Sequence, residues 1–164
     1  MKQIGFFDES KRLAVLSKLG DRLEWLNKVM DWRIFEETLE RVRPDKTKRG
    51  VGGRPPFSNG LLFRAVILQA LYNISDDQME FQINDRLSWQ RFLGLWLGDK
   101  VPDAKTIWLF RELLTTSGAY DELFELFNAR LFNYKSHVKV DKASKNITKW
   151  RVTAAIQRLH TWNC

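Results

Sequence analysis

Apolar residues recur at intervals of three and four along the first part of the chain, which is the spacing of one face of an α-helix. The pattern predicts three helices, the first capped by Asp8 or Ser10, the second capped by Asp21, and the third ended by Pro44. Ordinary core packing produces such a pattern, and so does a small bundle that pairs subunits. We interpret residues 1–43 as a helical bundle or pairing segment, with both alternatives open.

A second group of helices is expected over residues 58–133. Ser58 can cap a helix that is apolar nearly all round, which is typical of a helix buried at the centre of a domain. Ser75 begins a capping box that starts the next helix, a short helix is expected from Ser88, and Asp103 can cap another. The fold class that these patterns predict is mainly α.

The helix after Asp103 divides into two faces. Its apolar face must lie toward the core and carries Ile107, Phe110, Leu113 and Leu114. Its opposite face carries Lys105, Thr106, Trp108 and Arg111. Cations can reach phosphate or guanine, threonine can bond either, and tryptophan can pack on sugar or a thymine methyl. This face predicts a DNA-reading helix in a helix-turn-helix-like segment, although an ordinary surface with Trp108 packed on a neighbouring helix fits the pattern equally well.

Residues 44–57 have no hydrophobic period and include the run PDKTKRGVGGRPP, which is typical of a basic Gly/Pro linker. Its glycines do not make a phosphate-binding loop, because no Lys-Ser/Thr pair follows them. Four cations of the linker can lie along DNA phosphates, and a solvated hinge is the alternative. They are Lys46, Lys48, Arg49 and Arg54.

The charge distribution strengthens the case for a polyanionic partner. The chain has 164 residues, 44% of them hydrophobic, and a net charge of +7. The excess lies in residues 43–54, with five Lys/Arg against one Asp/Glu, and in residues 130–164, with eight against one. The single cysteine, Cys164, cannot form an internal disulfide, and no signal peptide or membrane span is evident. A cytoplasmic protein, nucleoid-associated when bound to DNA, is expected.

Long phrases of the chain resemble the N-terminal region of bacterial DDE transposases of the insertion-sequence-five group. The phrases are GGRPPFSNGLLFRAVILQALYNISDDQMEFQINDRLSWQRFLGL and DKVPDAKTIWLFRELL, and the resemblance extends over roughly residues 1–133. It implies that residues 58–133 form the helical DNA-binding domain that recognises the terminal inverted repeats of an insertion element. It also implies double-stranded DNA as a partner, and a homo-oligomer or a hetero-oligomer with full-length transposase.

In that family a ribonuclease H-like catalytic domain follows, in which two Asp and one Glu bind divalent metals, commonly Mg²⁺. Here the chain passes after Phe132 to NYKSHVKVD, which resembles a later β-hairpin of that domain, without the phrase similar to IVDAT that carries the first catalytic Asp. The pattern predicts a β-hairpin remnant at 134–153 and an aberrant tail at 154–164.

The sequence therefore predicts an internally deleted and truncated family member with no catalytic residues, no metal ligands and no cofactor. Mg²⁺ is expected only for a full-length member. The expected function is DNA binding without cleavage. The alternatives are an oligomerisation or inhibitory partner of intact transposase subunits, and a decayed remnant without function.

Overall fold

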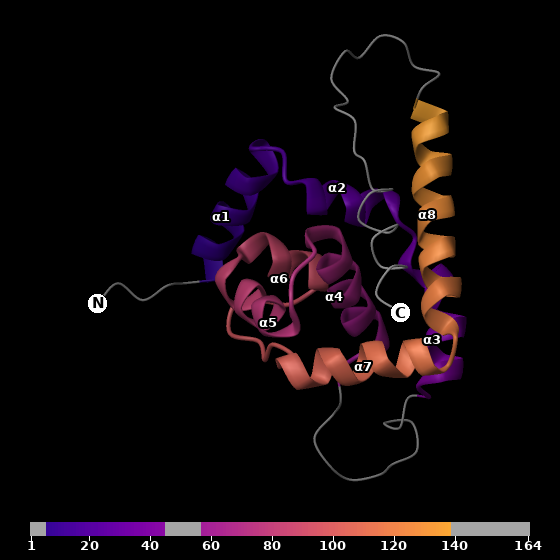
Figure 1. Cartoon of the computed structure of the whole chain (residues 1–164). Helices are drawn as coiled ribbons and strands as arrows, with labels where there is room; N and C mark the ends of the chain where they lie inside the picture. Colours follow the sequence, from indigo (N-terminus) through magenta and orange to yellow (C-terminus); the bar gives the residue numbers. More distant parts are fainter. Residues whose placement is uncertain (1–5, 45–56, 139–164) are drawn as a thin grey trace.

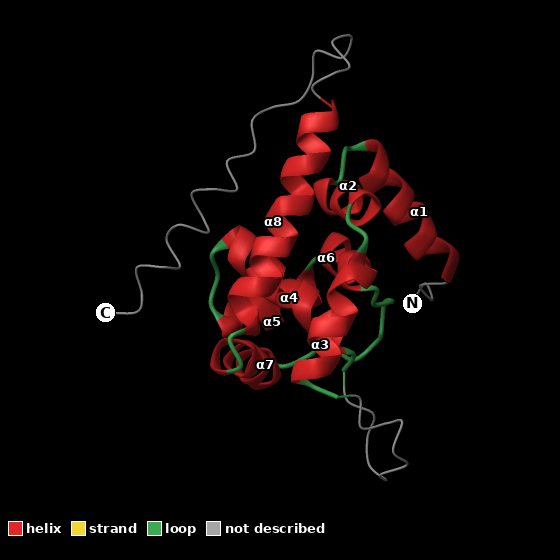
Figure 2. Cartoon of the chain, turned by 90° about the vertical axis from the view of Figure 1, so that its right-hand side faces the viewer, coloured by secondary structure: helices red, strands yellow, loops and turns green. Residues whose placement is uncertain are grey.

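The computed structural model describes residues 6–44 and 57–138, and every regular element in these two ranges is helical (Figures 1 and 2). This confirms the mainly α class. The elements are α1 Phe6–Lys18, α2 Arg22–Val29, the 3-10 helix η1 Trp32–Phe35, α3 Glu36–Val42, α4 Asn59–Tyr72, α5 Asp76–Asp85, α6 Leu87–Leu93, α7 Ala104–Thr116 and α8 Ala119–Val138.

Four helices begin where the sequence predicts a capping side chain. Asp21, Ser58, Ser75 and Asp103 accept hydrogen bonds from backbone N–H groups of the first turns of α2, α4, α5 and α7, at 2.9, 3.2, 3.2 and 2.7 Å. Each bond satisfies one of the amides that a helix start leaves without a partner. These predictions are confirmed.

One predicted helix start is wrong, and the short helix predicted from Ser88 is confirmed with its start one residue earlier. The first helix begins at Phe6, before Asp8 and Ser10, so neither of these side chains occupies the capping position. α6 begins at Leu87, and Arg86 at its N-cap makes no side-chain capping bond.

The central helix, α4, is buried along most of its length and is surrounded by α3, α5, α6 and α7 (Figure 1). The core around it also includes residues that precede the linker. The ring of Phe35, at the end of η1, lies 4.9 Å from the ring of Phe63 on α4, and both side chains are buried. Leu23 and Leu39 belong to the same cluster. Residues on the two sides of the linker thus share one hydrophobic core, and α2 and α3 use their apolar faces in it.

The last helix, α8, runs on to Val138, so residues 134–138 are helical. The prediction that a β-hairpin begins at 134 is therefore wrong. Extending an existing helix gains one hydrogen bond for each residue fixed, whereas two strands without a sheet are marginal in water. Residues 139–153 of the predicted hairpin and the tail at 154–164 lie outside the described residues.

Candidate nucleic-acid interface

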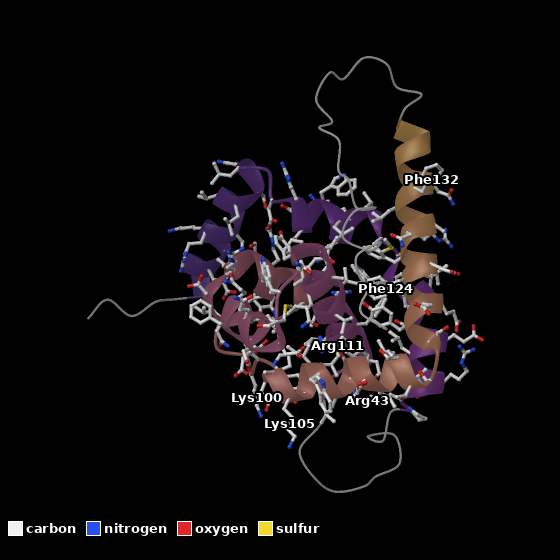
Figure 3. The ribbon with its side chains drawn as sticks, in the orientation of Figure 1. Arg43, Lys100, Lys105, Arg111, Phe124 and Phe132 are labelled. Atoms are coloured by element: carbon white, nitrogen blue, oxygen red, sulfur yellow. The ribbon has the colours of Figure 1, made fainter. Side chains whose placement is uncertain are left out.

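Helix α7 presents one face to the core and one to the solvent, as its spacing predicts. Ile107, Phe110 and Leu114 are buried against the neighbouring helices. On the outer face Lys105, which is labelled in Figure 3, is exposed, and Trp108 has 45% of its surface accessible. No hydrogen bond or ion pair joins Lys105 to another described residue. The outer face therefore offers a cation and an indole to a ligand.

The first turn of α7 is capped by two carboxylates. Asp103 accepts from the backbone N–H of Thr106 at 2.7 Å, and Glu80 on α5 accepts from the backbone N–H of Ala104 at 2.7 Å. Hydrogen bonds from the side chain and then the backbone of Thr106 hold the pKa of Asp103 below its usual range. Two α7 amides are thus occupied, so a phosphate at this end would be bound by side chains. Thr106 is half-buried.

The capping role of Glu80 is not predicted from the sequence. Its carboxylate meets Ala104 across 24 positions of the chain, and no local pattern announces a cap supplied by another helix. Glu80 is partly buried, but this is known from the structure and not from the sequence.

Arg111, which the sequence places on the outer face, turns its guanidinium toward α5. Nη1 and Nη2 donate to the two carboxylate oxygens of Asp76 at 2.8 and 2.9 Å, and Nη1 also donates to Gln69 Oε1 at 2.9 Å. Such a bidentate contact is among the stronger hydrogen-bonded pairs in proteins. Arg111 therefore joins α7 to α5 and α4, and a contact with DNA would require it to leave Asp76.

The two ends of the basic linker meet beside α7. Arg43 Nη1 donates to the carbonyl oxygen of Phe57 at 2.9 Å and to Asn59 Oδ1 at 2.8 Å, and Asn59 Nδ2 donates back to Arg43 O at 2.7 Å. The Arg43 guanidinium carbon also lies 6.0 Å from the ring centre of Phe110 on α7. The chain therefore leaves and re-enters the fold next to α7.

Lys46, Lys48, Arg49 and Arg54 lie outside the described residues. Their charges nevertheless affect the balance of the molecule. Residues 6–44 and 57–138 together carry 16 Lys/Arg and 18 Asp/Glu, although the whole chain has a net charge of +7. The excess positive charge therefore belongs to the segments outside these ranges, and one of them begins and ends beside α7.

A shallow pocket of about 230 Å³ lies between the end of α3, α4 and α7. Its lining residues are Arg43, Leu62, Thr106, Leu109, Phe110 and Leu113. Four of the six lining residues are apolar and the guanidinium of Arg43 already bonds Phe57 and Asn59, so the pocket is a mainly apolar hollow beside α7.

A metal site or a membrane-spanning helix would point to a different class of protein. Within residues 6–44 and 57–138, no group of three or more His, Cys, Asp or Glu side chains is placed to hold a metal ion. No helix in the same part of the chain combines the length and the apolar character needed to cross a membrane.

A protein-family model described as a transposase domain (DUF772) matches residues 11–113. The match covers more than half of the chain, which therefore belongs to this transposase-domain family and has a transposase-related role. The matched range extends from within α1 through most of α7, so it includes the outer face of α7 and the linker. No solved structure matches the chain.

Proposed function

We propose that this chain is a DNA-binding module that recognises the terminal inverted repeats of an insertion element. In this proposal α7 is the reading helix of a helix-turn-helix-like arrangement. Lys105, Thr106 and Trp108 approach the bases, and linker cations contact phosphates. We assign the chain to the insertion-sequence-five group because its sequence resembles that group.

One observation carries the proposal. The exposed Lys105 and Trp108 share the outer face of α7, and a segment with four cations leaves and re-enters the fold beside the same helix. Specific DNA-binding proteins combine base-reading side chains with cations that position the protein on the phosphates. Since transposases act on DNA, membership of the transposase-domain family supports DNA as the polyanion.

Arg111 has a different role in this proposal. Because Asp76 and Gln69 hold its guanidinium, we assign it to positioning α7 against α5 and not to direct base contact. Base reading then depends on side chains nearer the start of the helix.

We further propose that the chain does not cleave DNA by itself. The resemblance places the first catalytic carboxylate of the family in a block that is missing after Phe132. Asp141 follows instead, between Lys139 and Lys142, and a lone carboxylate between two cations does not make a two-metal site.

A binding experiment tests the proposal. The complete chain is titrated with a duplex that carries the ends of a related insertion element, and with a scrambled duplex of the same length and composition, at two salt concentrations. We expect the end duplex to bind more tightly at both. Equal affinity for the two duplexes would contradict recognition of the repeats.

Pairing with other transposase subunits is a second candidate function. Residues 1–43 contribute the apolar faces of α2 and α3 to the core, but Leu19 and Trp25 remain 78% and 42% exposed. Light scattering of the wild type and of the Leu19→Gln variant over a range of concentrations tests this candidate. A monomer throughout would exclude self-pairing.

A further inference from the structure

Helix α1 is attached to the rest of the fold mainly through polar contacts. Among its described side chains only Glu9 is buried, at 7% exposure, and Glu9 Oε1 accepts from the backbone N–H of Leu97 at 3.1 Å. Farther along the helix, Arg91 on α6 donates to Ser17 Oγ at 2.9 Å and to Leu13 O at 3.4 Å. No described side chain of α1 joins the hydrophobic core.

The face of α1 that points away from the fold is cationic. Lys11, Val15 and Lys18 follow one another at intervals of four and three, which places them on one side of the helix, and Arg12 lies at its flank. All four side chains are exposed. The three cations have no hydrogen-bond or ion-pair partner among the described residues. We call this set the outer face of α1.

Three carboxylates of the same region, those of Glu9, Asp21 and Glu24, bond to groups of the fold. Arg91 forms ion pairs with Asp21, whose side chain is only 7% exposed, and with Glu24 at 3.2 Å. Glu24 also pairs with Lys28 at 2.9 Å, and Glu9 bonds Leu97 as described. These carboxylates are thus neutralised locally. The other acidic residue of α1, Asp8, lies three and four positions before Lys11 and Arg12, and the three cations outnumber it. The outer face of α1 therefore has an excess of positive charge, although the described residues as a whole carry a slight negative charge.

We propose that the outer face of α1 is a second DNA-binding surface, which contacts the phosphate backbone without reading sequence. The inference rests on the proposed function only in taking DNA as the polyanion. α1 and α7 lie at separate edges of the molecule in both views, so this surface is distinct from the outer face of α7 (Figures 1 and 2). Lysine and arginine without base-reading neighbours are the groups that bind phosphates irrespective of sequence.

Two other occupants fit the same face less well. A second copy of this face would bring like charges together, which is unfavourable. An anionic membrane surface requires a broad apolar stripe. Leu13 and Leu16 of α1 are half-buried, so the exposed large apolar side chains here are Val15 and, just after the helix, Leu19, which make only a narrow stripe. Phosphates of DNA need only the cations.

The test measures how the affinity for a random-sequence duplex depends on salt. The double variant Lys11→Gln/Lys18→Gln removes two cations that have no partner among the described side chains. The matched control, Arg33→Gln/Arg41→Gln, removes two exposed cations that pair with Asp31 and Glu122. The slope of log K against log salt falls by about 0.9 for each phosphate that the protein no longer neutralises. We expect a decrease of about 1 to 2 for the first variant and a much smaller one for the control.

The two proposals fail in distinguishable ways. Equal binding of the wild type to end and scrambled duplexes contradicts the proposed function. Even then, a smaller slope of log K against log salt in Lys11→Gln/Lys18→Gln supports phosphate binding by the outer face of α1. An unchanged slope in Lys11→Gln/Lys18→Gln, or equal changes in both double variants, overturns the inference. The inference is also overturned if Lys11→Gln/Lys18→Gln loses binding to phosphatidylserine vesicles while its binding to the duplex is unchanged. Since the substituted side chains are exposed, circular dichroism should show unaltered helix content, and Arg12→Gln provides an independent reading on the same face.

Discussion

The carboxylate of Glu80 accepts a hydrogen bond from the backbone N–H of Ala104, so a side chain of α5 caps the first turn of α7. Loss of a helix cap lowers the free energy of unfolding by roughly 0.5–2 kcal/mol. We expect a loss of this size in Glu80→Ala, measured by urea denaturation. Glu80→Gln keeps an oxygen that can accept the bond and should lose less. Equal losses in the two variants would show that the bond does not stabilise the fold.

The bidentate contact between Arg111 and Asp76 should stabilise the fold more than it affects DNA binding. Arg111→Lys retains the charge but loses the bidentate geometry, and we expect the free energy of unfolding to fall by about 1–2 kcal/mol. Affinity for the end duplex, measured well below the unfolding temperature, should change little because Asp76 already occupies the guanidinium. Unchanged stability with a large loss of affinity would instead place Arg111 on the DNA.

Stability should fall in acid as Glu24 becomes protonated. Hydrogen bonds from Ser17 and Lys28 lower the pKa of this carboxyl from 4.5 to about 2, and the positive charge of Arg91 contributes as well. Because the pKa of Glu24 is lower in the folded state, the stabilisation by its ionised carboxylate is complete above pH 4.5 and is lost as the pH falls toward 2. The urea midpoint of the wild type should drop over that interval, and the drop should be smaller in Glu24→Gln. An identical drop in both proteins would assign the acid sensitivity to other groups.

Lys105 and Trp108 should contribute to DNA binding in different ways. Lys105→Gln should weaken binding to end and scrambled duplexes alike and lower the salt slope by about 0.9. Trp108→Ala should instead reduce the preference for the end duplex, by about 1–3 kcal/mol if the indole packs on a base. Phe132→Ala is the control, since Phe132 is a 73% exposed aromatic residue on α8, away from Lys105 (Figure 3). A control as damaging as Trp108→Ala would contradict a specific role for the indole.

Residues before and after the linker should unfold together. Phe35 is fully buried against Phe63, and truncation of such a residue costs about 3–5 kcal/mol. We expect Phe35→Ala to lose stability in this range and to unfold in a single transition that tryptophan fluorescence and circular dichroism report alike. Two separate transitions would show that the segments fold independently.

The features that the sequence predicts correctly are local. Asp21 and Asp103 cap helices whose amides lie two or three residues away, so the pattern alone reveals them. The helical spacing likewise places Ile107 in the core. Contacts between residues that are far apart in the sequence could not be predicted in this way. A helical projection puts Arg111 on the outside, but its side chain is long enough to reach Asp76 on another helix. At 134–138 the resemblance to a family hairpin predicts a strand, but the preceding helix supplies hydrogen-bond partners for its own continuation.

The bonds of Arg43 to Phe57 and Asn59 have a consequence for how this family could vary. Since these contacts hold the two ends of the linker together, the core does not depend on how many residues connect them. Lengthening a flexible loop costs only about 0.6 kcal/mol for each doubling. Insertions and deletions at 45–56 should therefore be tolerated, and each would change how far the linker cations reach along a duplex while α7 stays in place.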